Sequence, residues 1–266
     1  MKRQFAVLLV IIASLGCCSS FAQSPVEKAW TILDAGFKDS NDSDRATAVR
    51  VLGLLQNNKK AQEQAELALQ DKDSIVRVAG ANALRQMHSV ESIAKLKELL
   101  KDKESPVVLA AANALKNLGD PTGYEVFYAI LTGERKSGAG LLDDQKKMLS
   151  DPKKMAQFGF EQGIGYIPFA SVGIGAIKAF TKDDSSPVRA AAAISLAKDP
   201  DPKSGEALVA AAADKKEIVR AAALDAIAQR DDPSLLPGIM AAMDDKEDQV
   251  KYTAAAAVIR LSAKQK

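Results

Sequence analysis

Small and apolar residues recur along this chain at the spacing of one helix face. After Val76, for example, Ala79, Gly80, Ala83 and Leu84 follow three, four, seven and eight positions further on. This spacing matches the 3.6-residue period of an α-helix, so the segment predicts an amphipathic helix. Because alanine and glycine are small, such helices can pack closely against one another.

The same motif begins at five valines, and its spacing is nearly constant. Successive copies are separated by 31, 81, 31 and 31 residues. The valines that start them are Val76, Val107, Val188, Val219 and Val250. A weaker copy runs over residues 44–52. A fixed period of this length is typical of repeat architectures built from one supersecondary unit.

A second helix is predicted between successive copies. Asp-Pro steps at 120–121, 201–202 and 232–233 start these helices, because aspartate caps a helix and proline fits its first turn. For the same reason Ser105 and Ser186, each followed by proline, are predicted N-caps of motif helices. The intervening helices are expected within 93–100, 126–131, 208–213 and 235–243. Each unit is then helix–turn–helix, and stacked units bury one another's apolar faces.

The Asp-Pro helix followed by Ser-Pro-x-Val-Arg-x-Ala-Ala-x-Ala-Leu resembles HEAT repeats, and most closely the short HEAT-like repeats of phycobilisome lyases. The resemblance covers most of residues 40–265. It implies an all-α fold, an α-solenoid in which HEAT-like helix pairs form a right-handed superhelix, with the Val-Arg-Ala helices on the concave side. It also implies a structural role between repeats for the residue after the valine. That position holds Arg77, Arg189, Arg220 and Lys251, whereas Val108 breaks the series.

Residues 134–180 interrupt the repeat. A glycine-containing loop stands where a further copy should begin, near position 138, and aromatic residues that are scarce elsewhere follow it. Long solenoid insertions often lie on a binding face, so we take four of these aromatics as candidate partner-binding residues. They are Phe158, Phe160, Tyr166 and Phe169. The alternative is a distorted repeat whose aromatics fill a gap in the core.

We therefore expect one continuous solenoid with an irregular insertion. Its N-terminal HEAT-like repeats span residues 23–133, the irregular insert spans 134–180, and the C-terminal HEAT-like repeats span 181–266. Residues 1–22 are excluded from the fold because they read as a secretion signal. Lys2 and Arg3 precede an uncharged, mostly apolar run over 5–16, and Ser20-Phe21-Ala22 is a cleavage site for a signal peptidase.

The predicted signal indicates a protein exported to the periplasm or beyond the cell. Its apolar run is shorter than the roughly 20 residues that span a bilayer. An alternative is a lipoprotein, because Ser14-Leu15-Gly16-Cys17 resembles a degenerate lipobox. Lipidation of Cys17 would anchor the chain in the envelope. Membrane contact is otherwise expected only through the insert.

The place of the charges and thiols changes what the composition indicates. The chain has 36 basic and 34 acidic residues, but residues 1–22 hold two of the bases and none of the acids. The remainder has 34 of each and is neutral. Both cysteines, Cys17 and Cys18, also lie in the predicted signal. The exported chain would therefore lack thiol chemistry, and its charge balance argues against binding nucleic acid.

Residues suited to catalysis or metal binding are scarce. His88 is the only histidine, so no histidine-based cluster can form, and its place after a helix suits a cation at a helix C-terminus. Acidic pairs such as Asp183-Asp184 and Asp244-Asp245 lie at repeat boundaries without the spacing of a calcium loop, which favours helix capping. We expect no cofactor, no metal and no enzymatic activity.

The exposed side of the Val-Arg-Ala helices is a second candidate surface. We expect positions two and six after each valine to lie there, and we take four of these residues as partner-binding candidates. They are Asn82, Asn113, Asp225 and Tyr252. The sequence thus favours a non-enzymatic scaffold for another protein or a peptide. Two alternatives stay open: a membrane-associated envelope protein, and a non-catalytic or lyase-like subunit of an enzyme complex.

Overall fold

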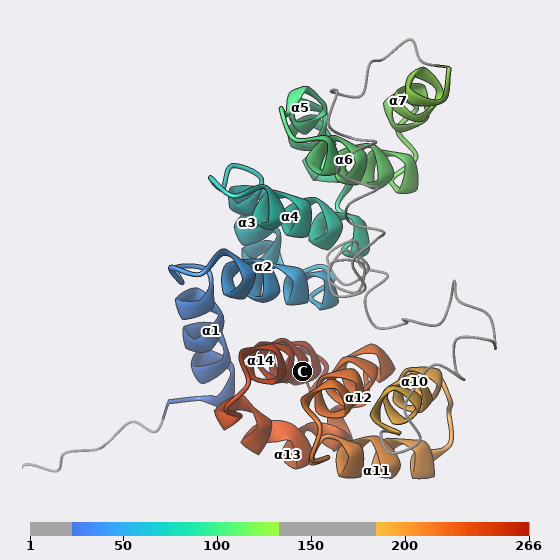
Figure 1. Ribbon diagram of the computed structural model, residues 1–266. Coiled ribbons are helices and arrows are strands. Elements are labelled where there is room, and N and C mark those ends of the chain that lie inside the picture. Colours follow the sequence, from blue (N-terminus) through green and yellow to red (C-terminus); the bar gives the residue numbers. More distant parts are fainter. Residues whose placement is uncertain (1–22, 133–184, 266) are drawn as a thin grey trace, which may run out of the picture.

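The computed structural model describes residues 23–132 and 185–265. Every regular element in these ranges is a helix, and the two ranges form an N-terminal arm (23–132) and a C-terminal arm (185–265) (Figure 1). The predicted signal peptide, the alternative lipidation site and the insert over 134–180 lie outside the described residues. So do the candidate aromatics Phe158, Phe160, Tyr166 and Phe169.

The N-terminal arm contains α1 (Pro25–Gly36), α2 (Asp42–Arg50), α3 (Lys59–Ala68), α4 (Ser74–Gln86), α5 (Ile93–Glu98), α6 (Ser105–Asn117) and α7 (Thr122–Leu131). The C-terminal arm contains α10 (Ser186–Ser195), α11 (Pro202–Ala211), α12 (Glu217–Arg230), α13 (Leu236–Ile239) and α14 (Asp248–Ala263). Short 3-10 helices complete them: η1 (Val51–Leu54), η2 (Val90–Ser92), η3 (Leu99–Lys101), η5 (Pro233–Leu235) and η6 (Met240–Asp244).

The helices pack as the predicted pairs, which confirms the all-α solenoid. The inner helices α2, α4, α6, α10, α12 and α14 carry the Val-Arg-Ala motif or its weaker copy, and we call the others outer helices. Outer helix α3 packs on α4, α11 packs on α12, and α5 and α13 pack on α6 and α14 with the help of η3 and η6. Small side chains make the close packing possible, since the four alanines from Ala254 to Ala257 in α14 are fully buried.

The aspartates that precede proline cap their helices as predicted. The Asp201 carboxylate accepts the backbone N–H of Lys203 at 2.9 Å, and Asp232 accepts that of Ser234 at 3.0 Å. The prediction for the Ser-Pro helices is wrong by one residue, because α6 and α10 already include Ser105 and Ser186. At α6 the cause is Asp102, whose carboxylate accepts the N–H of Glu104 at 2.8 Å and fixes Glu104 as the N-cap.

The inner helices follow one another in space in an order that differs from their order in the chain. The last helix, α14, packs on α1, α2 and η1 as well as on α12. The row therefore runs α10, α12, α14, α2, α4, α6, and Figure 1 shows it as an arc with the outer helices around its outside. Outer helix α1, at the start of the described chain, packs mainly on α14 and less on α2.

This order places α1 and α14, the first and last described helices, in the middle of the row and leaves α6 and α10 at the two ends of the row of described inner helices. The motif valines reflect these positions. Val76, Val107, Val219 and Val250 are at most 1% exposed, whereas Val188, at the start of α10, is 52% exposed. No helix in residues 23–132 or 185–265 is long and apolar enough to cross a membrane.

Candidate functional site

Arginines in the position after the motif valine connect successive repeats. Arg77 of α4 donates Nε and Nη2 to the Asp102 carboxylate at 2.8 and 3.0 Å, and Nη1 to the carbonyls of Asp71 and Lys72 at 2.8 and 3.1 Å. One guanidinium thus binds the turn before its helix and the turn before the next inner helix. The resemblance to HEAT repeats implied such a role for this arginine.

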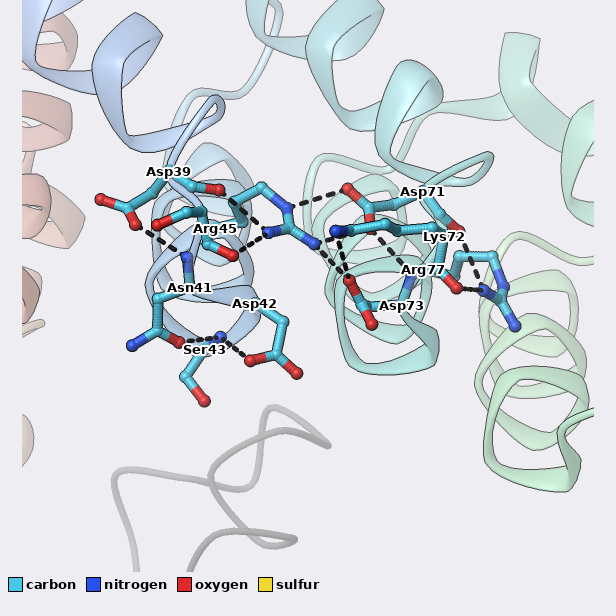
Figure 2. Close-up of polar contacts among 10 residues, drawn as sticks. Asp39, Asn41, Asp42, Ser43, Arg45, Asp71, Lys72, Asp73 and Arg77 are labelled. Atoms are coloured by element: carbon cyan, nitrogen blue, oxygen red, sulfur yellow. Dashed lines mark hydrogen bonds and ion pairs between the residues drawn. The ribbon is translucent and has the colours of Figure 1, made fainter.

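The same arrangement recurs in both arms. Arg45 pairs with Asp71 and Asp73, Arg220 with Asp245, and Arg189 with Asp214. Figure 2 shows the Arg45 guanidinium between the turn that contains Asp39 and the turn that contains Asp71 and Asp73. We call these four arginines and the aspartates that they pair with the Arg–Asp ladder. Arg45 and Arg77 are only 5% and 8% exposed. Their charges can be buried because the ladder aspartates and the turn carbonyls bind them.

Hydrogen bonds lower the pKa values of four ladder carboxylates. Burial favours the neutral form of Asp102, but hydrogen bonds from Arg77 and from the Glu104 amide outweigh burial and lower its pKa. The pKa values of Asp71 and Asp245 are lowered against the same opposing effect of burial. The hydrogen bond from Arg189 is the main cause of the lowered pKa of Asp214. The ladder is therefore a structural feature of the repeat.

The ladder is incomplete where the two arms meet. We call the contacts of α14 and η6 with α1, α2 and η1 the joint. At the joint Lys251 takes the arginine position, and its Nζ binds Asp248 of its own helix at 2.6 Å. Asp39 occupies the turn position of the ladder aspartates and accepts the N–H of Asn41 at 2.9 Å. Among the described residues, no arginine makes a hydrogen bond to its carboxylate.

A second irregularity at the joint is Asp44. It stands one residue before Arg45, which is the position of the buried valines in other repeats. Burial raises the pKa of Asp44, and the nearby carboxylates of Asp248 and Asp39 raise it further. Burial is also the main cause that raises the pKa of the Tyr252 phenol to about 12, and the carboxylates of Asp248, Asp39 and Asp44 add to it. The joint therefore brings the carboxylates of Asp39, Asp44 and Asp248 close to one another and to Tyr252.

The prediction that Asn82 and Tyr252 lie on an exposed face is wrong. Asn82 is fully buried, and Tyr252 is 4% exposed. Position two after the valine faces the neighbouring inner helix, so it is buried in other repeats too, as Val78 and Ala221 show with 3% and 0% exposure. Tyr252 packs at the joint, where its ring lies close to Gly36 of α1.

Positions six and ten after the valine point away from the outer helices. A Cβ on Gly80, four positions after the valine of α4, would lie 2.9 Å from the carbonyl oxygen of Ala65 in α3. Each residue turns an α-helix by about 100°, so positions six and ten lie roughly 200° and 240° further round. We call the partly or fully exposed polar residues that occupy these positions within the inner helices the inner stripe. They are Arg50, Gln86, Asn113, Asn117, Asp225, Gln229 and Arg260.

Two predicted candidates, Asn113 and Asp225, belong to the inner stripe and are partly exposed. The Asn117 amide donates to the backbone and side-chain oxygens of Asn113 at 2.8 and 3.0 Å. The Gln229 amide donates to the carboxylate of Asp225. The structure does not bring the two candidates together, because α14, α2 and α4 lie between α12 and α6 in the row.

The middle of the inner stripe contains residues that the sequence analysis missed. Burial raises the pKa of Asp225, while its hydrogen bond with Gln229 and the charges of Arg50 and Arg260 oppose that rise. Arg260 pairs with Asp231 at 2.6 Å and donates Nη1 to the Leu54 carbonyl of η1, also at 2.6 Å. The motif marks the positions of these residues, but their proximity depends on α14 lying between α12 and α2.

Two grooves of about 430 Å³ each lie on the outer side of the solenoid. One is lined by α11 and α13 residues such as Val209 and Gly238, and it includes the ladder pair Arg220–Asp245. The other lies between α1 and α3 and includes Asp71 of the ladder. Both follow from the spacing of neighbouring outer helices. No group of three or more histidine, cysteine or acidic side chains in residues 23–132 and 185–265 could hold a metal ion.

A comparison with protein families agrees with this architecture. Residues 31–116 and 175–259 match the family model for HEAT repeats. No curated protein matches the chain. Among solved structures, human deoxyhypusine hydroxylase in complex with glycerol is 18% identical, with a TM-score of 0.34, and the match covers 90% of this chain and 97% of that one. The complex of CpcE and CpcF of phycocyanin lyase from Nostoc sp. PCC7120 is 19% identical, with a TM-score of 0.35, over 89% and 94% of the two chains.

Proposed function

Because this chain belongs to the HEAT-repeat family, we propose that it is an exported, non-enzymatic scaffold that binds another protein or a peptide through its inner stripe. HEAT repeats typically mediate protein binding, and the inner stripe is the observation that supports this function here. It extends along the inner helices of both arms, and its asparagine and glutamine amides can each donate and accept hydrogen bonds. Such groups suit a polar polypeptide better than an apolar ligand.

The charges of the inner stripe limit the kind of partner. Arg50 and Arg260 lie near Asp225, so the middle of the stripe holds both signs of charge. Long-range electrostatic steering therefore contributes little, and local shape and hydrogen bonding decide which partner binds. The insert over 134–180 remains a second proposed contact surface because of its aromatic residues.

Pull-down from an envelope extract tests this function. The bait is the chain with Asn113→Ala, Asn117→Ala and Gln229→Ala, compared with the unsubstituted chain. The matched control replaces three lysines whose side chains are 83–90% exposed outside the stripe: Lys59→Ala, Lys103→Ala and Lys246→Ala. We expect the control to keep its partner and the stripe variant to lose it. A stripe variant that retains every partner would contradict the proposal.

Deletion of 134–180 measures the contribution of the insert in the same pull-down. If the deletion leaves every partner bound, the insert is structural. Turnover of any substrate by the purified chain would contradict the non-enzymatic function.

The proposed export depends on the predicted signal over residues 1–22. Mass spectrometry of the mature N-terminus distinguishes the alternatives, because signal-peptidase cleavage gives Gln23 and lipoprotein processing gives an acylated Cys17. We expect Gln23. A compatible feature is that α1 begins two residues later, where Ser24 and Glu27 form a reciprocal capping box. The first turn of α1 is therefore capped by residues that would remain after this cleavage.

A further inference from the structure

The two arms of this chain meet in a contact that is far from their covalent connection. Residues 133–184 connect the arms between α7 and α10, and α10 stands at the far end of the row from α6 and α7. The joint lies in the middle of that row and is made by residues about two hundred positions apart, such as Arg260 with Leu54 and Lys28 with Asp244. Only non-covalent contacts hold it.

The joint has the composition of an interface between subunits. Its centre is apolar and closely packed, because the Tyr252 ring and the Ala48 side chain both lie close to Gly36 while Leu33 of α1 is fully buried. Ion pairs lie at its edge, since Lys28 Nζ binds both carboxylate oxygens of Asp244 at 2.6 and 2.7 Å. A buried apolar centre with a polar rim is the usual anatomy of a protein–protein interface.

The joint also lacks contacts that hold the other repeats together. Lys251 replaces the ladder arginine, and Asp44 replaces the buried valine. The two arms can therefore separate at the joint without breaking any Arg–Asp pair of the ladder. Separation exposes the apolar face of α14 on one arm and that of α1 and α2 on the other.

We propose that the joint is a docking surface for a second copy of this chain, in which α14 of one chain packs on α1 and α2 of another. Reciprocal exchange of arms makes both joints and closes a two-fold dimer without any new contact. The connection permits it, because 52 residues extend to at most about 170 Å when fully stretched. The intrachain joint has the advantage of an effective concentration on the order of millimolar, so exchange increases with protein concentration.

Cysteine crosslinking tests the exchange directly, because the chain from Gln23 onward contains no cysteine. One preparation carries Lys28→Cys and a second carries Asp244→Cys, two positions that face each other across the joint. The two are mixed at high concentration and treated with a short bismaleimide. A chain that carries both substitutions reports the intrachain joint. The matched control replaces Asp244→Cys by Lys59→Cys, an exposed position on α3 outside the joint.

We expect the double variant to crosslink within one chain and the mixed single variants to give a crosslinked dimer. The dimer should exceed that of the control pair by about tenfold, and its yield should rise with concentration while the intrachain yield stays constant. The proposal is overturned if the double variant crosslinks internally and the mixed pair gives no more dimer than the control. It is equally overturned if the double variant fails to crosslink, because the joint is then not formed by these residues.

Discussion

The ring of Tyr252, in α14, packs against Gly36 at the end of α1, the first helix in residues 23–132. A Cβ at Gly36 would lie 2.8 Å from Tyr252 Cζ and 2.7 Å from the Cβ of Ala48, which is closer than carbon atoms approach without displacement. The neighbouring helices α1 and α2 therefore meet α14, which is distant in sequence, at a point where only a hydrogen fits. This contact makes the position of α1 on α14 specific.

Substitution Gly36→Ala should destabilise the protein by about 1–3 kcal/mol, because the added methyl overpacks the joint from two sides. The matched control is Gly205→Ala in α11, where the nearest atoms are the Leu235 methyls at 3.1 and 3.4 Å and can move. That change should be neutral or stabilising, since alanine favours a helix by up to about 1 kcal/mol over glycine. Urea unfolding of both variants measures the difference, and equal effects would contradict the tight contact at Gly36.

Substitution Arg77→Lys should lower the free energy of unfolding by about 2 kcal/mol. A lysine keeps the charge but cannot bind the Asp102 carboxylate and two carbonyls at once, so buried acceptors lose their donors. Arg189→Lys is the comparison, because the Arg189 side chain is 42% exposed and pairs with Asp214 at the end of the row. We expect that change to cost less than about 1 kcal/mol. Similar unfolding midpoints for the two variants would contradict the structural role of the buried ladder.

Substitution Lys251→Arg should stabilise the joint by extending the Arg–Asp ladder across it. The arginine would reach Asp39, which occupies the ladder position and already binds the N–H of Asn41. We expect a gain of about 1 kcal/mol, typical of a partly exposed bidentate pair. A double-mutant cycle with Asp39→Ala checks the cause. The gain should disappear in the Asp39→Ala background, and a gain that persists there would show that it arises elsewhere.

Substitution Asp44→Val should stabilise the protein at neutral pH and change how stability depends on pH. The folded state raises the pKa of Asp44 above its ordinary value of 3.8, so folding favours its protonated form. Asp44 therefore contributes most to the stability of the folded state below pH 3.8, and this contribution is lost as the pH rises through the raised pKa. The gain from valine should therefore be larger at pH 7 than at pH 4.

Urea midpoints of the unsubstituted chain and Asp44→Val between pH 4 and pH 8 measure this difference. Comparing the two chains at each pH removes the contribution of the ladder carboxylates, which has the opposite sign. Because the pKa values of these carboxylates are lowered, they stabilise the folded state above the ordinary aspartate pKa of 3.8. That stability is lost as the pH falls through the lowered pKa values. A gain that is the same at every pH would contradict the charge effect at Asp44.

The exposed face of the inner helices shows the limit of a periodic pattern. The motif located these helices and distinguished their buried side, but it placed position two on the exposed side. Tyr252 and Val78 are buried there because the neighbouring inner helices cover them. Helix periodicity describes one helix and its own apolar face, whereas exposure in a solenoid also depends on the width of the contact with each neighbour.

The sequence by itself determined the repeat, the helix pairs and the aspartate caps, since each follows from the spacing and local chemistry of a few adjacent residues. Only the tertiary structure decided that the C-terminal repeats precede the N-terminal ones in the row, with α14 between α12 and α2. A repeat specifies which faces stack, but equivalent units can stack in any order that their connections allow. The order followed from contacts made once in the molecule, among them Tyr252 on Gly36 and Arg260 on Leu54, and no periodic signal marks those contacts.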